Sequence, residues 1–312
     1  MRVLNPFVRL RLALDVGTAA TRACSHTSQV IESASVVRED DGTASLRRSA
    51  LRGGVVCDIA AAANVIQSMV RRLAPRWGEA GAIVTLPTDV SPSEREALVE
   101  AVTEAGATVI ALVPEPLAAA IGAGVDVSSE YASLVADLGD GVCDAAVIRD
   151  GRIVRSRALR VGCSDARGAI VDWLSWHRGL AVDDDVADRV LREYCRNVSL
   201  PEISAAGIAK GGAARTERVG RDDLAVLIDP VAGRIASFLA AMLREMPDRE
   251  AEAARETGIH LTGGGALLGL FVRRIEMATG LRAVVGDDPL WSVIAGAREM
   301  LGNGTVAARA TS

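Results

Sequence analysis

Lysine, aromatic residues and cysteine are all scarce in this sequence. Lys210 is the only lysine among 35 basic residues, and phenylalanine, tryptophan and tyrosine together make up 3% of the 312 residues. Because no basic stripe interleaves with aromatic side chains and the formal net charge is -5, we expect no nucleic-acid partner. The five cysteines are odd in number and form no Cys-x-x-Cys pair, which argues against a disulfide framework or a zinc site.

A transmembrane span and a signal peptide are also not evident, and we expect neither. Residues 1–14 carry three arginines and a proline and are too short to span a bilayer. Met1, Val3, Leu4 and Phe7 in this segment would suit peripheral contact with an anionic leaflet, although a plain lead-in to the first strand is the stronger interpretation. Hydrophobic residues make up 49% of the chain, enough for two α/β cores. We expect a cytoplasmic protein, with membrane association as an open alternative.

Two of the glycine turns look like copies of each other. Residues 14–17 and 136–139 both follow an apolar strand, have the form apolar-Asp-apolar-Gly, and lead into an alternating stretch. This pattern predicts two hairpins and an internal duplication. The turn N–H groups and the hydroxyl of Thr18 or Thr21 would bind phosphate, while Asp15 and Asp137 would hold the water shell of Mg²⁺. For either hairpin alone, an Asx-stabilised turn is the favoured interpretation, and only the pair together with a third glycine turn reverses that preference.

A third glycine turn follows a predicted strand that contains the apolar residues Ile259 and Leu261. Gly263, Gly264 and Gly265 let the backbone approach a ligand closely, and we expect an amphipathic helix directly after them. The free N–H groups at the start of that helix would face a phosphate or a base edge. A tight strand-to-helix turn explains the triplet alone, so the nucleotide interpretation depends on all three turns together.

A carboxylate lies between these turns, at the start of a predicted helix. The helix has Pro116 in its first turn, where a missing N–H costs nothing, and this places Glu115 at the helix start. Glu115 would either cap the helix or orient a water molecule for attack on a terminal phosphate.

These four segments, in this order, resemble the actin superfamily, and most closely the MreB/Mbl type of bacterial actin homologues that determine cell shape. The resemblance covers about residues 12–301, and its most specific runs are 83–87, 115–124, 160–162, 261–268 and 288–290. It implies an α/β, actin-like (ribonuclease H-like duplicated) fold of two lobes with a nucleotide cleft between them. The first lobe would comprise residues 1–127 and 294–312 and the second lobe residues 128–293. The small subdomains would be reduced, at 38–52 and at 176–220.

The resemblance also implies ATP and Mg²⁺ as ligands. Glu115 would position the hydrolytic water, and Asp15 and Asp137 would act on Mg²⁺ through water. The implied nucleotide-binding residues are Gly17, Thr18, Ala19, Ala20, Gly139, Asp140, Gly141, Asp184, Asp188, Gly263, Gly264, Gly265 and Ala266.

Several of these positions depart from the family pattern. Ala20 replaces an asparagine, and Val142 replaces a hydroxyl residue, which weakens the case for rapid hydrolysis. Asp184 and Asp188 stand where the family has two glutamates that contact the nucleoside, although acids at a helix start also suit the helix dipole. We therefore expect at most a slow ATPase.

The functional hypothesis is a bacterial actin-like cytoskeletal protein. It would form filaments or co-assemble with a full-length relative, contact the membrane and cell-wall synthesis proteins, and contribute to cell shape. One alternative is a non-polymerising, nucleotide-binding scaffold or regulator with little or no ATP turnover. A small-molecule kinase of the same superfold is less favoured, because no substrate-binding insertion is present.

Overall fold

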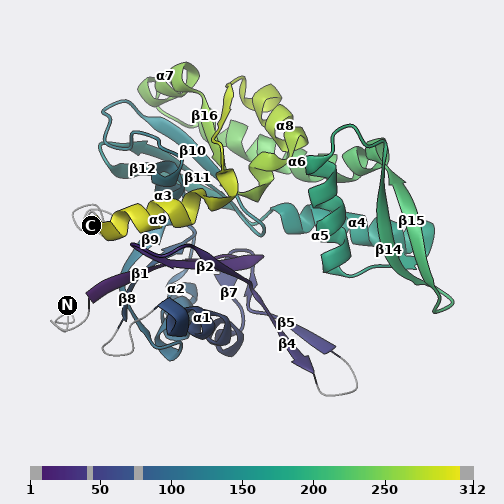
Figure 1. The fold of residues 1–312 in the computed structure, drawn as a ribbon. Helices are drawn as coiled ribbons and strands as arrows, with labels where there is room; N and C mark the ends of the chain where they lie inside the picture. The colour runs from purple at the N-terminus through teal and green to yellow at the C-terminus, as the bar shows by residue number, and fades with distance from the viewer. Residues whose placement is uncertain (1–8, 41–44, 74–79, 303–312) are drawn as a thin grey trace.

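Two five-stranded sheets of the same topology form the centre of the molecule (Figure 1). The computed structural model describes residues 9–40, 45–73 and 80–302, so the predicted membrane-contact residues in 1–7 lie outside it. The first sheet has the order β3-β2-β1-β8-β9, and the second β12-β11-β10-β16-β17. The strands of the first are β1 (Arg9–Val16), β2 (Ala20–Ser25), β3 (Ile31–Ala34), β8 (Ala80–Leu86) and β9 (Ala107–Pro114). Those of the second are β10 (Ser133–Leu138), β11 (Cys143–Arg149), β12 (Arg152–Leu159), β16 (Ile259–Thr262) and β17 (Ala283–Val285).

The strand pairing confirms the predicted duplication. β1 pairs antiparallel with β2 and parallel with β8, and β10 pairs antiparallel with β11 and parallel with β16. Every residue of β8 and of β10 is buried, as expected for central strands that are covered on both faces.

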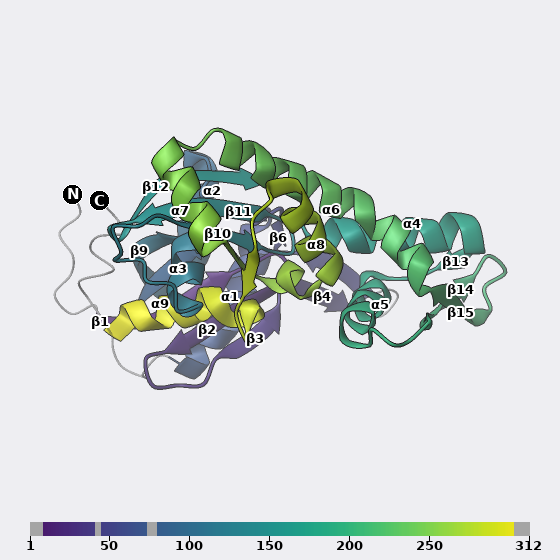
Figure 2. The ribbon, with the colours of Figure 1, turned by 90° about the horizontal axis from the view of Figure 1, so that it is seen from above.

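Helices cover both sheets. Their bounds are α1 (Ile59–Leu73), α2 (Pro92–Glu104), α3 (Glu115–Gly122), α4 (Cys163–Arg178), α5 (Asp184–Arg196), α6 (Arg221–Arg244), α7 (Asp248–Thr257), α8 (Gly269–Thr279) and α9 (Ser292–Gly302). Local sequence explains the start of α2, because Ser91 and Glu94 form a capping box with Pro92 in the first turn. Figure 2 shows α6 lying along the second lobe. Its length and mean hydropathy of 1.7 would suit a membrane span, but Leu224, Ile228 and Leu239 bury its apolar face in the core.

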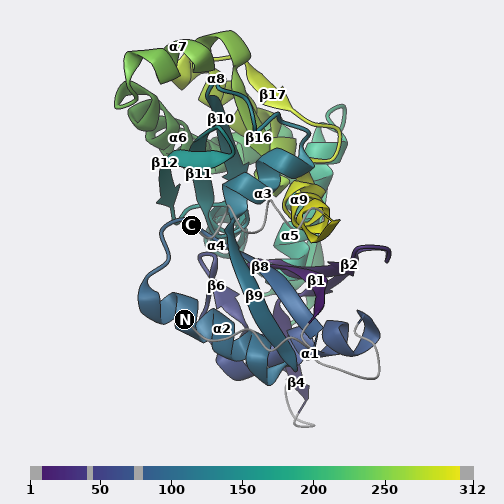
Figure 3. The ribbon, with the colours of Figure 1, turned by 90° about the vertical axis from the view of Figure 1, so that its left-hand side faces the viewer.

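Two helices cross between the sheets (Figure 3). α3 follows β9 of the first sheet but packs on β10 and β11, whereas α9 follows the second sheet but packs on β1 and β2. The two helices touch through glycine, because a Cβ atom added at Gly122 or Gly296 would lie 1.9 Å from a carbonyl oxygen of the other helix. The chain therefore ties the two sheets together twice.

Smaller elements extend from each sheet. In the first half, β4 (Val36–Asp40) pairs with β5 (Ser45–Ser49) and β6 (Leu51–Arg52) with β7 (Val55–Val56). In the second, β13 (Leu180–Ala181), β14 (Glu202–Ala209) and β15 (Ala214–Gly220) form a three-stranded sheet beside α5. That these parts are reduced relative to the family, and that the lobes divide near residues 127 and 293, stay predictions.

Candidate functional site

Four buried carboxyl groups gather where the two lobes meet. Asp15 and Asp137 each lie one residue before the end of their strands, β1 and β10. Glu115 starts α3, and Asp144 lies on β11. Each is at most 6% exposed. Electrostatic repulsion from the three aspartates acts on Glu115, so the fold places the three predicted catalytic acids in one cluster and adds Asp144 to them.

The surroundings of Asp15 and Asp137 are alike in one contact, from a threonine, and differ in another, from the opposite strand of the hairpin. Thr85 on β8 donates a hydrogen bond to Asp15 (3.3 Å), and Thr262 on β16 donates one to Asp137 (2.8 Å). Asp15 is opposite Arg22 across its hairpin and pairs with it at 3.3 Å. The equivalent neighbour of Asp137 is Asp144, a second acid.

Sequence reasoning missed Arg22, Thr85 and Thr262. The two threonines had a usable signal, since each is a polar residue near the end of a mostly apolar strand. Arg22 had none, because alternating strands commonly carry charged residues on an exposed face.

Burial raises the pKa of every carboxyl in the cluster. Desolvation is the largest cause, and it brings the pKa of Asp137 to about 6 and that of Asp144 to about 7. The pKa of Asp15 is also raised, and that of Glu115 lies well above its usual value because the neighbouring aspartates add to the desolvation. Negative charge here is therefore costly, and a bound cation would relieve the cost.

The residues present fit a magnesium ion held through water. In the described ranges, no group of three or more Cys, His, Asp or Glu side chains is arranged to ligate a metal directly. One Asp137 oxygen accepts from Thr262, while its other oxygen receives no hydrogen bond from the described residues. Asp137 is thus positioned to bind a water molecule of a hydrated cation.

The raised pKa values predict that acid stabilises the nucleotide-free protein. Unfolded aspartates lose their protons near pH 4, whereas folded Asp137 keeps its proton up to about pH 6. Folding takes up protons in this window, so the free energy of unfolding should fall as pH rises, by at most about 1.4 kcal/mol per pH unit for each carboxyl. Urea unfolding from pH 4 to 7 measures this slope. Asp137→Asn should flatten it between pH 4 and 6, and an unchanged slope would contradict the assignment.

The two hairpin loops close in the same way and touch at their tips. The Gly17 N–H donates to the Ala20 carbonyl (3.2 Å), and the Gly139 N–H donates to the Val142 carbonyl (2.9 Å). A Cβ atom at Gly141 would lie 2.6 Å from the Thr18 hydroxyl oxygen, so Thr18 and Gly141 are direct neighbours. Ala19 is in the same turn as Thr18, and Ala20 begins β2. Thr21 is buried and pairs its hydroxyl with that of Ser35, which in turn donates to the Gly17 carbonyl (2.6 Å).

The triple-glycine turn differs from the expectation. A short 3-10 helix (Gly264–Leu267), which includes Ala266, follows β16, and α8 begins only at Gly269. The prediction of an α-helix directly after the glycines is therefore wrong. Gly263, with φ +78°, and Gly265 are required by protein packing, because Cβ atoms there would lie 2.5 and 2.7 Å from Leu138 atoms. At Gly264 the nearest atom would be a Leu290 methyl carbon at 3.5 Å, so this position has room.

This difference predicts a selective effect at Gly264. Gly264→Val should keep the fold and weaken ATP binding by about tenfold or more if the turn faces the nucleotide. Titration with a fluorescent ATP analogue, alongside thermal unfolding, checks both parts. The matched control is Gly211→Val at the tip of the β14–β15 hairpin, where a Cβ atom would meet no described atom within 4 Å. Unchanged ATP affinity in Gly264→Val would contradict a role for the turn.

The remaining predicted site residues are connected by an arginine. Arg167 on α4 pairs with both carboxylate oxygens of Asp140 and lies 3.8 Å from a carboxylate oxygen of Asp188. It therefore links the second hairpin loop to α5. Asp184 is exposed in the first turn of α5, which Asp183 caps, and in the described part of the chain no hydrogen bond or ion pair joins Asp184 to this group. Sequence reasoning missed Arg167, which lies outside every recognised motif.

Comparison with known proteins finds matches along most of the chain. A family profile described as "MreB/Mbl protein" matches residues 42–308. "Cell shape-determining protein MreB" of Escherichia coli K12 is 30% identical over 264 residues, covering 80% of this chain and 74% of that protein. "Cell shape-determining protein Mbl" of Bacillus subtilis 168 is 24% identical over 259 residues, covering 81% and 78%.

Solved structures match the whole architecture. MreB 5 of Spiroplasma citri bound to AMPPNP superimposes with a TM-score of 0.85 at 23% identity, covering 96% of this chain and 98% of that one. The MamK double helical filament gives a TM-score of 0.77 at 18% identity, covering 94% and 99%. These matches confirm the predicted two-lobed, actin-like fold.

Proposed function

Because the chain belongs to the MreB/Mbl family, we propose that it is a bacterial actin-like cytoskeletal protein that binds ATP and Mg²⁺ between its lobes. It works in the cytoplasm, forms or joins filaments at the membrane, and contributes to cell shape and cell-wall synthesis. The observation that carries the proposal is the cluster of Asp15, Asp137 and Glu115 beside two touching glycine loops.

Each part of the site has a proposed role. Thr18 and the N–H groups of the loops at Gly17 and Gly139 bind the phosphates, and the turn at Gly264 lies against the adenosine. Asp15 and Asp137 hold Mg²⁺ through water, and the ion supplies charge stabilisation to the phosphates. Glu115 orients the attacking water. Support comes from relatives solved with AMPPNP and with ADP.

Filament formation is supported by a structural relative solved as a double helical filament. One observation favours the alternative of a nucleotide-binding regulator without turnover. Val142, in the second loop, is buried and has no hydroxyl to offer a phosphate or a water molecule.

The test is sedimentation of the purified protein with MgATP, with and without anionic liposomes, followed by electron microscopy of the pellets. The proposal expects filaments with MgATP and fewer with EDTA. A protein that binds ATP but never pellets, alone or with lipid, would favour the regulator instead. Transfer of phosphate to a small acceptor would favour a kinase.

A further inference from the structure

We propose that Arg160 is a positioning residue of the nucleotide site, which reaches across the two lobes and orients the hydroxyl of Thr18. This inference rests on the proposed function. Arg160 lies between β12 and α4 in the second half of the chain, and its partners all lie in the first. It touches none of the four clustered acids, so its effect on a ligand would be exerted through other residues.

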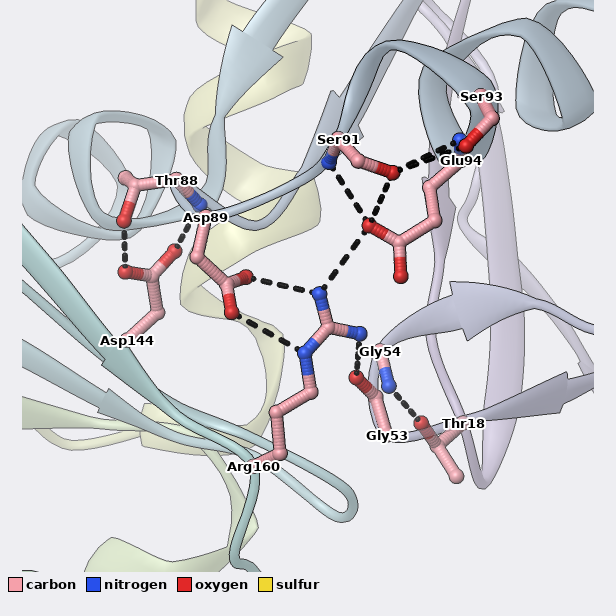
Figure 4. Close-up of polar contacts among 10 residues, drawn as sticks. All are labelled: Thr18, Gly53, Gly54, Thr88, Asp89, Ser91, Ser93, Glu94, Asp144 and Arg160. Carbon is pink, nitrogen blue, oxygen red and sulfur yellow. Dashed lines mark hydrogen bonds and ion pairs between the residues drawn. The ribbon is translucent and has the colours of Figure 1, made fainter.

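The guanidinium group of Arg160 is held by three partners (Figure 4). Two parallel bonds of 3.1 Å join its Nε and Nη2 to the carboxylate of Asp89, and Nη2 lies 3.5 Å from Glu94. Nη1 donates to the carbonyl oxygen of Gly53 at 2.8 Å. A two-point carboxylate contact fixes the plane of the group, so the bond to Gly53 has a defined direction.

Gly53 and Gly54 form the turn between β6 and β7, and this turn reaches Thr18. The N–H of Gly54 donates to the Thr18 hydroxyl oxygen at 2.8 Å. A hydroxyl that accepts at its oxygen still has its hydrogen to donate, and in the described part of the chain no acceptor takes it. The contact therefore presents Thr18 as a donor, which is what a phosphate oxygen requires.

The same turn also touches the second loop. A Cβ atom at Gly141 would lie 2.8 Å from the Cα atom of Gly53 and 2.9 Å from its nitrogen. Gly53 thus lies against the second loop while Gly54 binds the first. Both loop tips therefore lie against the turn that Arg160 holds, and the Thr18 hydroxyl is the group to which this turn donates a hydrogen bond.

A second cross-lobe contact strengthens the first. Asp144 on β11 accepts from the backbone N–H of Thr88 (2.7 Å) and from its hydroxyl (2.6 Å). Thr88 and Asp89 are adjacent, so two elements of the second lobe bind successive residues of the first (Figure 4). Separating the two lobes at this edge requires both contacts to break.

The test is a double-mutant cycle on ATP affinity. Arg160→Gln should weaken ATP binding by about tenfold, whereas adenosine binding stays the same, because Thr18 is assigned to phosphate. Thr18→Val alone should weaken ATP binding similarly. If Arg160 acts through Thr18, the double variant loses no more than Thr18→Val. Fully additive losses, or equal losses for adenosine and ATP, would overturn the inference.

Two further variants control for charge and folding. Arg157→Gln removes an arginine from β12 that pairs with Glu245 within the second lobe, so it should leave ATP affinity unchanged. Arg160→Lys keeps the charge but not the two-point contact and should lose most of the same affinity.

Amide hydrogen exchange separates this inference from the proposed function. In the nucleotide-free protein, Arg160→Gln should speed exchange at the Gly54 amide. Exchange at the Thr88 amide, which donates to Asp144, should change much less. If the wild type binds no ATP, the proposed function fails, and this measurement still tests the contact. Unchanged exchange at Gly54 would overturn the positioning role by itself.

Discussion

Replacing Glu115 with glutamine is expected to lower ATP turnover by about 100-fold or more while ATP affinity stays the same or rises. A carboxylate that orients or deprotonates an attacking water molecule typically contributes a factor of that size. Affinity should not fall, because the variant removes an acid from a cluster that also holds Asp15 and Asp137 and so reduces repulsion of the phosphates. Glutamine keeps the size and shape of the side chain.

Phosphate release and equilibrium binding of a fluorescent ATP analogue measure the two quantities separately. Glu130→Gln is the control, since it removes the charge of an exposed glutamate in the loop before β10. Parallel losses of turnover and affinity would show that Glu115 contributes to ATP binding or folding and does not orient the attacking water. A wild type that binds ATP and releases no phosphate would support the regulator.

The largest effect on stability is expected from Gly296→Ala. One added methyl group would lie 1.9 Å from the carbonyl oxygen of Ala118, so α3 and α9 would have to move apart. Overpacking of this kind costs on the order of 3 kcal/mol. The strain would fall on the two helices that join the sheets, so both lobes should be affected.

The denaturant midpoint and the exchange of amides in both sheets measure this effect. Gly233→Ala in α6 is the matched control, because a Cβ atom there would meet no described atom within 4 Å. It should stabilise the protein by about 0.5–1 kcal/mol through helix propensity. If Gly296→Ala unfolds at the same midpoint as the wild type, the close crossing of α3 and α9 is not required for stability.

Local sequence predicted several elements correctly. The two Asp-containing glycine turns close the β1–β2 and β10–β11 hairpins as expected, and the start of α2 follows from Ser91 and Glu94, which form a capping box three positions apart. Such features depend on residues a few positions apart, so their patterns are visible in one short window. The triple-glycine turn was harder, because its glycines serve contacts with the distant Leu138 as well as the local turn.

The sequence by itself determined the duplication, the acids at the ends of two strands and the start of one helix, and the family resemblance. Only the tertiary structure decided which residues surround those acids and what joins the lobes. Thr262 reaches Asp137 from 125 positions away, and Arg160 reaches Gly53 from 107. These pairings depend on the strand order, which only the folded chain establishes. In the sequence, an arginine that bridges the two lobes is surrounded by the same kinds of residues as an arginine exposed to solvent, so local sequence does not distinguish them.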